Sequence, residues 1–206
     1  HYHPEAYAVS EEGYFIQGSA AIAEKISKEN WSIVQHEHNF SVTAHQSRGI
    51  KYHLDALWLG DKGWLQLLSI TEGHGADEKI VLEMIVPTTF IAEENFLQEL
   101  EERRELWMEK CNAHAVEDLV NSLYTDNTMY YNHRPMVQGH ETLSSVYQYM
   151  ARPSYSLQLE PLHLLAVHEG LVFEIGQCSG SYPGKYILVW VKTPSGEWKI
   201  LLDSNV

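Results

Sequence analysis

Two side chains in the second half of the chain have types and positions suited to acid–base chemistry. His133 follows a predicted strand over residues 128–132, and an imidazole can act as a general base near neutral pH. Glu174 interrupts an otherwise apolar strand predicted over residues 171–181, and a carboxylate facing a pocket there would have a raised pKa. The alternatives are a loop histidine without a role, and a glutamate that faces solvent or pairs with an arginine.

Aromatic side chains in the same half could line an apolar pocket. Trp107, Tyr124 and Tyr147 lie on or beside predicted helices. Either Tyr130 or Tyr131 must face inward, because successive residues of a strand point to opposite faces. The predicted ligand-binding set is therefore Trp107, Tyr124, Tyr130 and Tyr147. Ordinary core packing is the competing interpretation.

A histidine pair in the first half could form half of a metal site. His36 and His38 share one face of a predicted strand, and His53 and Asp55 share a face of the next strand. If the strands are neighbours, two histidines and a carboxylate could meet, but a polar solvent-facing surface is the favoured interpretation. The chain has no Gly-rich phosphate loop, Gly-x-Ser-x-Gly elbow or His-Glu-x-x-His motif, so neither a cofactor nor a metal is predicted.

Charge and hydropathy exclude several kinds of partner. The net charge of -14 comes from 28 acidic and 14 basic residues, which disfavours binding to nucleic acid or to an anionic membrane surface. No apolar run approaches the ~20 residues that cross a bilayer, so the protein is expected to be soluble. The chain starts at His1 rather than Met, so a processed or trimmed start is expected and both cytoplasmic and exported locations stay open. Cys111 and Cys178 fit reduced core residues, with a disulfide as the alternative.

One sequence pattern occurs twice. The segment YAVSEEGYFIQG from Tyr7 aligns without a gap with TMYYNHRPMVQG from Thr128, so that Gly18 meets Gly139. Further along, the segment KIVLE, which ends at Glu83, aligns with KILLD, which ends at Asp203. A repeat this long indicates a duplicated domain. The predicted units are residues 1–89 and 90–206.

The two units differ in their helices. The second is expected to begin with a helix over residues 93–112 and a second helix with the apolar stripe Val116, Leu119, Val120 and Leu123. A third helix carries the stripe Leu143, Val146, Tyr147 and Met150, and four long strands with short turns follow at residues 155–167, 171–181, 185–192 and 197–203.

The first unit is expected to have a short strand at 7–9, one helix at 19–28, and strands at 31–44, 50–59, 64–70 and 79–86. It lacks the leading pair of helices, so the concave face of its sheet is expected to be covered by the other unit or by a partner chain. Glu11 and Glu12 at its first strand end are candidate bases, but no closed pocket is expected around them.

This order of elements resembles the nuclear transport factor 2-like superfamily, which includes SnoaL-like and ketosteroid isomerase-like proteins. The segment NAHAVEDLVNSLYTDNTMYYNHRPMVQGHETL is similar to the opening of that fold, and GKYILVWVKTPSGEWKILLD is similar to its last hairpin. The resemblance covers residues 93–206 and reaches residues 7–86 through the repeat. It implies an α+β fold with two tandem cone-like units, each a curved antiparallel sheet packed on helices, the first truncated.

The resemblance implies a small-molecule-binding protein with an apolar pocket in the second unit, and a pseudo-dimer within the chain or a homodimer. The superfamily's isomerase base falls at Asn132 or His133 and its tyrosine at about Trp107, and these residue types do not suit steroid isomerisation. Two alternatives stay open. One is an isomerase, cyclase or dehydratase that uses His133 and Glu174 as an acid–base pair on a small apolar or aromatic ligand. The other is a non-catalytic assembly module whose cavity is filled by Trp and Tyr side chains.

Overall fold

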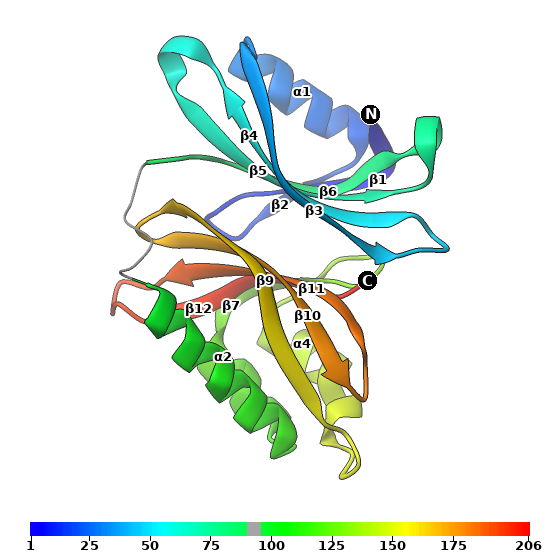
Figure 1. Ribbon diagram of the computed structural model, residues 1–206, viewed down its shortest axis with the longest axis vertical. Coiled ribbons are helices and arrows are strands. Elements are labelled where there is room, and N and C mark those ends of the chain that lie inside the picture. The colour runs from blue at the N-terminus through cyan, green and yellow to red at the C-terminus, as the bar shows by residue number, and fades with distance from the viewer. Residues whose placement is uncertain (90–95) are drawn as a thin grey trace. The chain divides into compact units, whose positions relative to one another are not determined.

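The computed structural model describes residues 1–89 and 96–206. The chain divides into two compact units, His1–Thr89 and Phe90–Val206, each with its own six-stranded sheet (Figure 1). Within the described ranges, no helix is long and apolar enough to cross a membrane.

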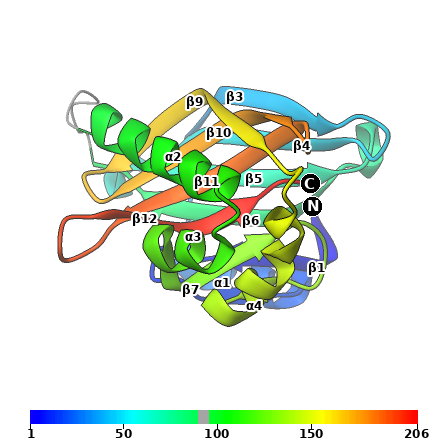
Figure 2. The same ribbon diagram turned by 90° about the horizontal axis from the view of Figure 1, so that it is seen from below.

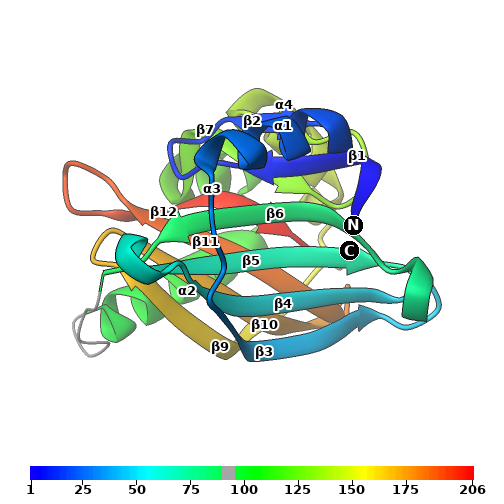
Figure 3. The ribbon, with the colours of Figure 1, turned by 90° about the horizontal axis from the view of Figure 1, so that it is seen from above.

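The first unit is a twisted sheet with one α-helix on one of its faces (Figure 3). The strand order is β2-β1-β6-β5-β4-β3. The helix is α1 (Ser19–Glu29). The strands are β1 (Tyr2–Val9), β2 (Phe15–Gln17), β3 (Gln35–His45), β4 (Ile50–Trp58), β5 (Trp64–Glu72) and β6 (Lys79–Pro87).

The second unit has the same strand order, β8-β7-β12-β11-β10-β9, with three helices on one face of the sheet (Figure 2). The helices are α2 (Leu97–Asn112), α3 (Val116–Leu123) and α4 (His140–Val146), which continues into a short 3-10 segment, η4 (Tyr147–Ala151). The strands are β7 (Tyr124–Tyr131), β8 (Val137–Gln138), β9 (Leu157–His168), β10 (Leu171–Gly180), β11 (Gly184–Lys192) and β12 (Trp198–Ser204).

The α+β class is confirmed, but the sheets are mixed rather than purely antiparallel. In each sheet the first strand pairs in parallel with the last, β1 with β6 and β7 with β12. Short turns in a sequence predict only the pairing of consecutive strands. The pairing of the first strand with the last is long-range and leaves no such local signal.

The register corrects the ungapped alignment of the first strands by one residue. Tyr7 pairs with Leu82 and Met129 pairs with Leu202, so Tyr7 corresponds to Met129 rather than to Thr128. The first unit has one extra residue, and it lies in the hairpin between β1 and β2. Ala8 pairs with Ile16, eight positions later, whereas Tyr130 pairs with Val137, seven positions later. Ala8 in the first unit therefore corresponds to Tyr130 in the second. A shift of one residue matters here because it moves every side chain of the strand to the opposite face of the sheet.

Most residues of the apolar stripes predicted for the second unit are buried in its core. Four residues of α3 and three of α2 are buried in one cluster with strand residues. Val146 is the exception in the third stripe, because α4 ends there and its side chain is 36% exposed. In the first unit the strand predicted from Trp31 begins only at Gln35. The helix predicted from residue 93 has Phe96 as the residue that precedes α2, and residues 93–95 of that prediction lie outside the described residues.

Gly18 and Gly139 precede α1 and α4 with φ angles of 99° and 83°. These angles are strained for any residue with a Cβ atom and favour glycine. The same backbone turn thus leads from the hairpin into the helix in both units.

Candidate functional site

An aromatic cluster surrounds Asp203 in the second unit. The indole Nε1 of Trp107 donates to the Tyr124 hydroxyl at 2.9 Å, and the hydroxyls of Tyr124 and Tyr147 donate to Asp203 Oδ2 at 2.7 and 2.6 Å. The Tyr130 ring packs edge-on against Tyr147, with centroids 5.3 Å apart. The structure therefore brings together the four side chains predicted to bind a ligand, and all four are buried.

Burial governs ionisation in this cluster. It raises the pKa of Asp203 to about 6, while the hydrogen bonds from Tyr147 and Tyr124 act in the opposite direction. Burial and the nearby carboxylate raise the pKa values of Tyr124 and Tyr147 well above the usual tyrosine value. Both hydroxyls therefore stay protonated and available as donors to Asp203.

The space left beside this cluster is small. A cavity of about 20 Å³ is lined by Trp107, Tyr147, Tyr186 and Asp203, among others. A volume of this size holds about one water molecule. The apolar pocket predicted for the second unit is thus filled by its own aromatic side chains in this structure.

Glu174 is fully buried and its carboxylate is saturated by protein donors. Arg104 Nε and Nη2 donate to Oε1 and Oε2 at 2.9 and 3.0 Å. The Tyr186 hydroxyl donates to Oε1 at 2.7 Å, and Trp190 Nε1 donates to Oε2 at 2.8 Å. Each oxygen accepts two hydrogen bonds, so the pairing with an arginine is the interpretation that the structure supports. Arg104 lies between Leu100 and Trp107 on the buried side of α2. A cation at that position in the sequence is a signal that a buried carboxylate pairs with it.

His133 lies in the exposed turn after β7, where its Nδ1 contacts Asn132 Oδ1. No contact between described residues connects it with Glu174, which lies in the core. The structure therefore does not bring the predicted acid–base pair together.

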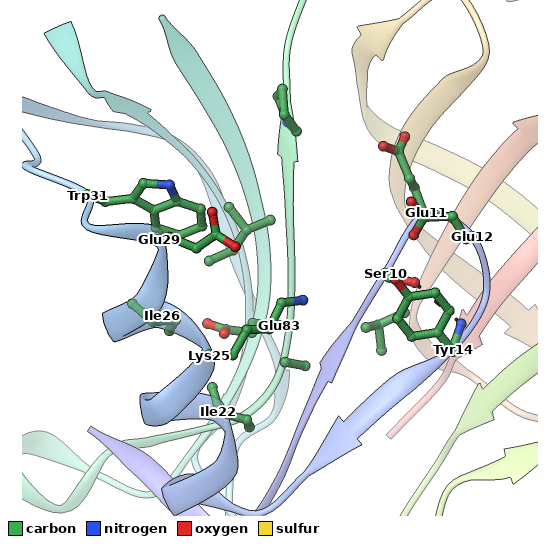
Figure 4. Close-up of a pocket in the computed structure, with 14 residues that line it drawn as sticks. Ser10, Glu11, Glu12, Tyr14, Ile22, Lys25, Ile26, Glu29, Trp31 and Glu83 are labelled. Atoms are coloured by element: carbon green, nitrogen blue, oxygen red, sulfur yellow. Dashed lines mark hydrogen bonds between the residues drawn. The ribbon is translucent and has the colours of Figure 1, made fainter. Parts of the chain in front are cut away.

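A larger cavity lies in the first unit, where no closed pocket was expected. Its volume is about 360 Å³, and β1, β6 and α1 contribute most of its walls (Figure 4). The apolar lining residues are Ala8, Val9, Ile22, Ile26, Ile85 and Pro87. The polar and aromatic lining residues are Ser10, Glu11, Glu12, Tyr14, Lys25, Glu29, Trp31 and Glu83. Glu11 and Glu12 line this open cavity, and both are exposed to solvent.

Glu83 is the buried charge of this cavity, with 3% of its surface exposed. The Tyr2 hydroxyl donates to Oε2 at 2.7 Å, and Lys25 extends from α1 toward Glu83 (Figure 4). Among the described residues, none donates a hydrogen bond to Oε1. Burial raises the pKa of Glu83 to about 7, with the Tyr2 hydrogen bond and the charges of Lys25 and the N-terminal amine acting in the opposite direction. The protonation state of this carboxyl therefore changes near neutral pH.

Sequence reasoning missed Glu83, although a signal existed. It is an acidic residue between Leu82 and Met84 in an apolar strand, and the repeat aligns it with Asp203. The cavity exists because Ala8 stands where the second unit has Tyr130. Residues 1–89 also contain no helix corresponding to α2, which supplies Trp107 to the aromatic cluster.

The histidines predicted as half of a metal site do meet Asp55. β3 and β4 are neighbours, and His36 Nε2 and His38 Nδ1 lie 3.2 and 2.8 Å from Asp55 Oδ1. His53 instead contacts the Thr71 hydroxyl at 3.0 Å, and burial lowers its pKa. In the described part of the chain, no group of three ligating side chains is arranged to hold a metal ion.

Comparison with known proteins gives similarity to solved structures only. No family model and no curated protein matches the chain. A ketosteroid isomerase-like protein from Erwinia carotovora atroseptica is 16% identical, with a TM-score of 0.45, over 53% of this chain and 94% of that one. A cystatin-like domain of unknown function from Nostoc punctiforme is 14% identical, with a TM-score of 0.45, over 57% and 80%. An NTF2-like protein of unknown function from Silicibacter pomeroyi is 8% identical, with a TM-score of 0.45, over 55% and 97%. These similarities carry no information on function.

Proposed function

We propose that the protein binds a small, largely apolar molecule in the cavity of the first unit. The observation that carries this proposal is the contrast between two equivalent carboxylates. Asp203 faces a space of about 20 Å³, whereas Glu83 faces one of about 360 Å³. The second unit then serves as a filled structural counterpart.

The cavity of the first unit has the properties of a ligand site. Its volume falls within the range of about 300–1,000 Å³ that is usual for small-molecule pockets. Aliphatic side chains of α1 and β6 supply the apolar surface, and Glu83 supplies a buried polar group with one oxygen that accepts no hydrogen bond from the described residues. A few polar groups in an apolar cavity orient a ligand and provide specificity.

The second unit has an open groove of about 300 Å³ beside α2 and β9, but the glutamates that line it are exposed to solvent. Its aromatic cluster and Glu174 give no comparable support to a ligand or an acid–base reaction. The cavity beside the aromatic cluster has room for about one water molecule. The Glu174 carboxylate already accepts four hydrogen bonds, and His133 is exposed to solvent. The aromatic filling agrees with the non-catalytic alternative for this unit.

The test is binding of an apolar fluorescent probe, naphthylmethanol, to the whole chain. Ala8→Tyr places in the first unit the side chain that the second unit has at Tyr130, and we expect it to abolish binding. Ala20→Tyr makes the same substitution on the exposed, opposite side of α1 and serves as the matched control. Ile26→Trp fills the cavity from the helix side and keeps the test valid if Ala8→Tyr does not fold.

The wild type and Ala20→Tyr should bind the probe, and the two cavity-filling variants should not. Equal binding by all four proteins would contradict the proposed location. Native mass spectrometry of gently purified protein complements the titration, because a co-purifying molecule should be present on the wild type and absent from Ala8→Tyr.

A further inference from the structure

We propose that the ligand of the first unit carries a cationic amine on an apolar body, with the amine placed at Glu83. This inference rests on the proposed function, because it concerns the ligand class of the same cavity. It is carried by the placement of Glu83, by the charges around the cavity and by Trp31.

Glu83 is a buried carboxylate with incomplete partners. Tyr2 supplies one hydrogen bond to Oε2, and the described residues supply none to Oε1. Lys25 extends from α1 toward Glu83 (Figure 4), and the two form no ion pair within 4.0 Å in the described part of the chain. A buried carboxylate is costly unless a hydrogen-bonded cation compensates it. An ammonium group donates up to three hydrogen bonds and meets that need at Oε1.

The electrostatics of the cavity select a cation over an anion. Its described lining contains four glutamates, of which Glu83 is buried and the other three are exposed, and one exposed lysine. The chain as a whole has a net charge of -14, which attracts cations and repels anions at long range. Among the described lining residues Lys25 is the one basic side chain, and Lys25 and the N-terminal amine are the two cations whose charges act on Glu83.

Trp31 and the aliphatic residues suit the remainder of such a ligand. Trp31 is half-buried at the end of the cavity near Glu29, and Ile22 and Ile26 project from α1 (Figure 4). An indole face attracts ammonium groups and also packs against flat apolar rings. The cavity therefore fits an apolar, preferably aromatic body with the amine directed to β6.

Amine binding should be coupled to the protonation of Glu83. The protonated carboxyl does not pair with an ammonium ion, so binding requires the ionised form. Because burial raises the pKa of Glu83 to about 7, the affinity for an amine should increase as the pH rises through 7. Below pH 7, binding should release a proton from Glu83 to the buffer.

The experiment compares three probes that share a naphthyl body: naphthylmethylamine, naphthylmethanol and naphthoate. At pH 8 we expect the amine to bind about tenfold more tightly than the alcohol, as an additional charged hydrogen bond allows. Glu83→Gln keeps the shape of the side chain and should remove this difference, while binding of the alcohol stays unchanged. Glu24→Gln makes the same substitution on the outer face of α1, where Glu24 pairs with Lys28 at 2.7 Å, and should bind like the wild type.

Each contrary outcome has a distinct meaning. Equal affinities for amine and alcohol, unchanged in Glu83→Gln, would overturn the amine inference and leave the proposed function standing. Tightest binding of naphthoate would also overturn it and would assign Lys25 as the anchor. Absence of binding by all three probes, with Ala8→Tyr indistinguishable from the wild type, would overturn the proposed function together with the inference.

Discussion

Glu83 and Asp203 occupy the same position in the last strands of the two sheets. Glu83 pairs with Ala8 on the first strand of its sheet, and Asp203 pairs with Tyr130 on the first strand of the other. Each accepts a hydrogen bond from a tyrosine hydroxyl, at 2.7 Å from Tyr2 and at 2.6 Å from Tyr147. The two units therefore share a buried carboxylate and differ in the volume left in front of it.

Glu83 should make the free energy of unfolding depend on pH. Its pKa of about 7 in the folded protein lies above the unfolded value of 4.5, so the folded state binds the proton more tightly. The stability from this carboxyl is therefore present at low pH and is lost as the pH rises from 4.5 through 7, by up to about 3 kcal/mol. Urea denaturation of wild type and Glu83→Gln at pH 5 and pH 8 measures it as the change in their stability difference. A difference that stays constant would show that Glu83 has an ordinary pKa.

Glu174 should be essential for stability. Glu174→Ala leaves the Arg104 guanidinium buried without its partner, which should cost about 3–5 kcal/mol. Replacing both residues, with Arg104→Met and Glu174→Leu, should restore most of the loss, because an apolar pair of similar volume needs no compensation. Chemical denaturation of the single and double variants gives the coupling between the two residues.

His133→Ala provides the contrast for this prediction. The side chain is exposed, so the substitution should change the stability by less than about 0.5 kcal/mol. An equally mild effect of Glu174→Ala would contradict the structural role and reopen an acid–base role for this carboxylate.

Tyr147→Phe should destabilise the protein through Asp203. The variant removes one of the two tyrosine donors to Oδ2 and keeps the ring that packs against Tyr130. The expected loss is about 1–2 kcal/mol, the usual cost of leaving a buried polar group with one partner fewer. The pKa of Asp203 should also rise, because the lost bond favours the ionised form. Tyr149→Phe, on the neighbouring partly buried ring, is the matched control and should leave that pKa nearly unchanged.

The sequence patterns predicted the class of the fold but not the site, for reasons that lie in particular residues. Helical stripes such as the one that begins at Val116 are local, and they correctly located α3 and the buried face of α2. Both cysteines are free and buried, as expected. The parallel pairing of β1 with β6 is set by contacts between distant segments, so no short pattern predicted it.

The cavity of the first unit could not be predicted because the alignment of the two first strands was off by one residue. With Tyr7 aligned to Thr128, Ala8 falls opposite Met129, and the exchange of a tyrosine for an alanine on the inner face stays hidden. The strand pairing places Ala8 at Tyr130 and so explains the cavity. The pairing of Glu174 with Arg104 is another long-range relationship, although a charged residue on each apolar element was visible in the sequence.

The two cysteines should be unreactive in the folded protein. Burial raises the pKa of the Cys111 thiol to about 12 and also raises that of Cys178. Thiolate is the reactive form, so neither residue should react with iodoacetamide at pH 8 under native conditions, whereas both should react in urea. Mass spectrometry after alkylation counts the modified sites. Rapid native labelling of Cys111 would show that the core of the second unit opens readily.

The most direct test of the ligand cavity is NMR of protein labelled at isoleucine and leucine methyl groups during titration with naphthylmethylamine. Ile22, Ile26 and Ile85 line the cavity of the first unit, and their signals should shift on binding. Leu157, Leu159 and Leu188 line the small cavity of the second unit and should stay unchanged. Shifts confined to these three leucines would place the ligand in the second unit and would contradict the account.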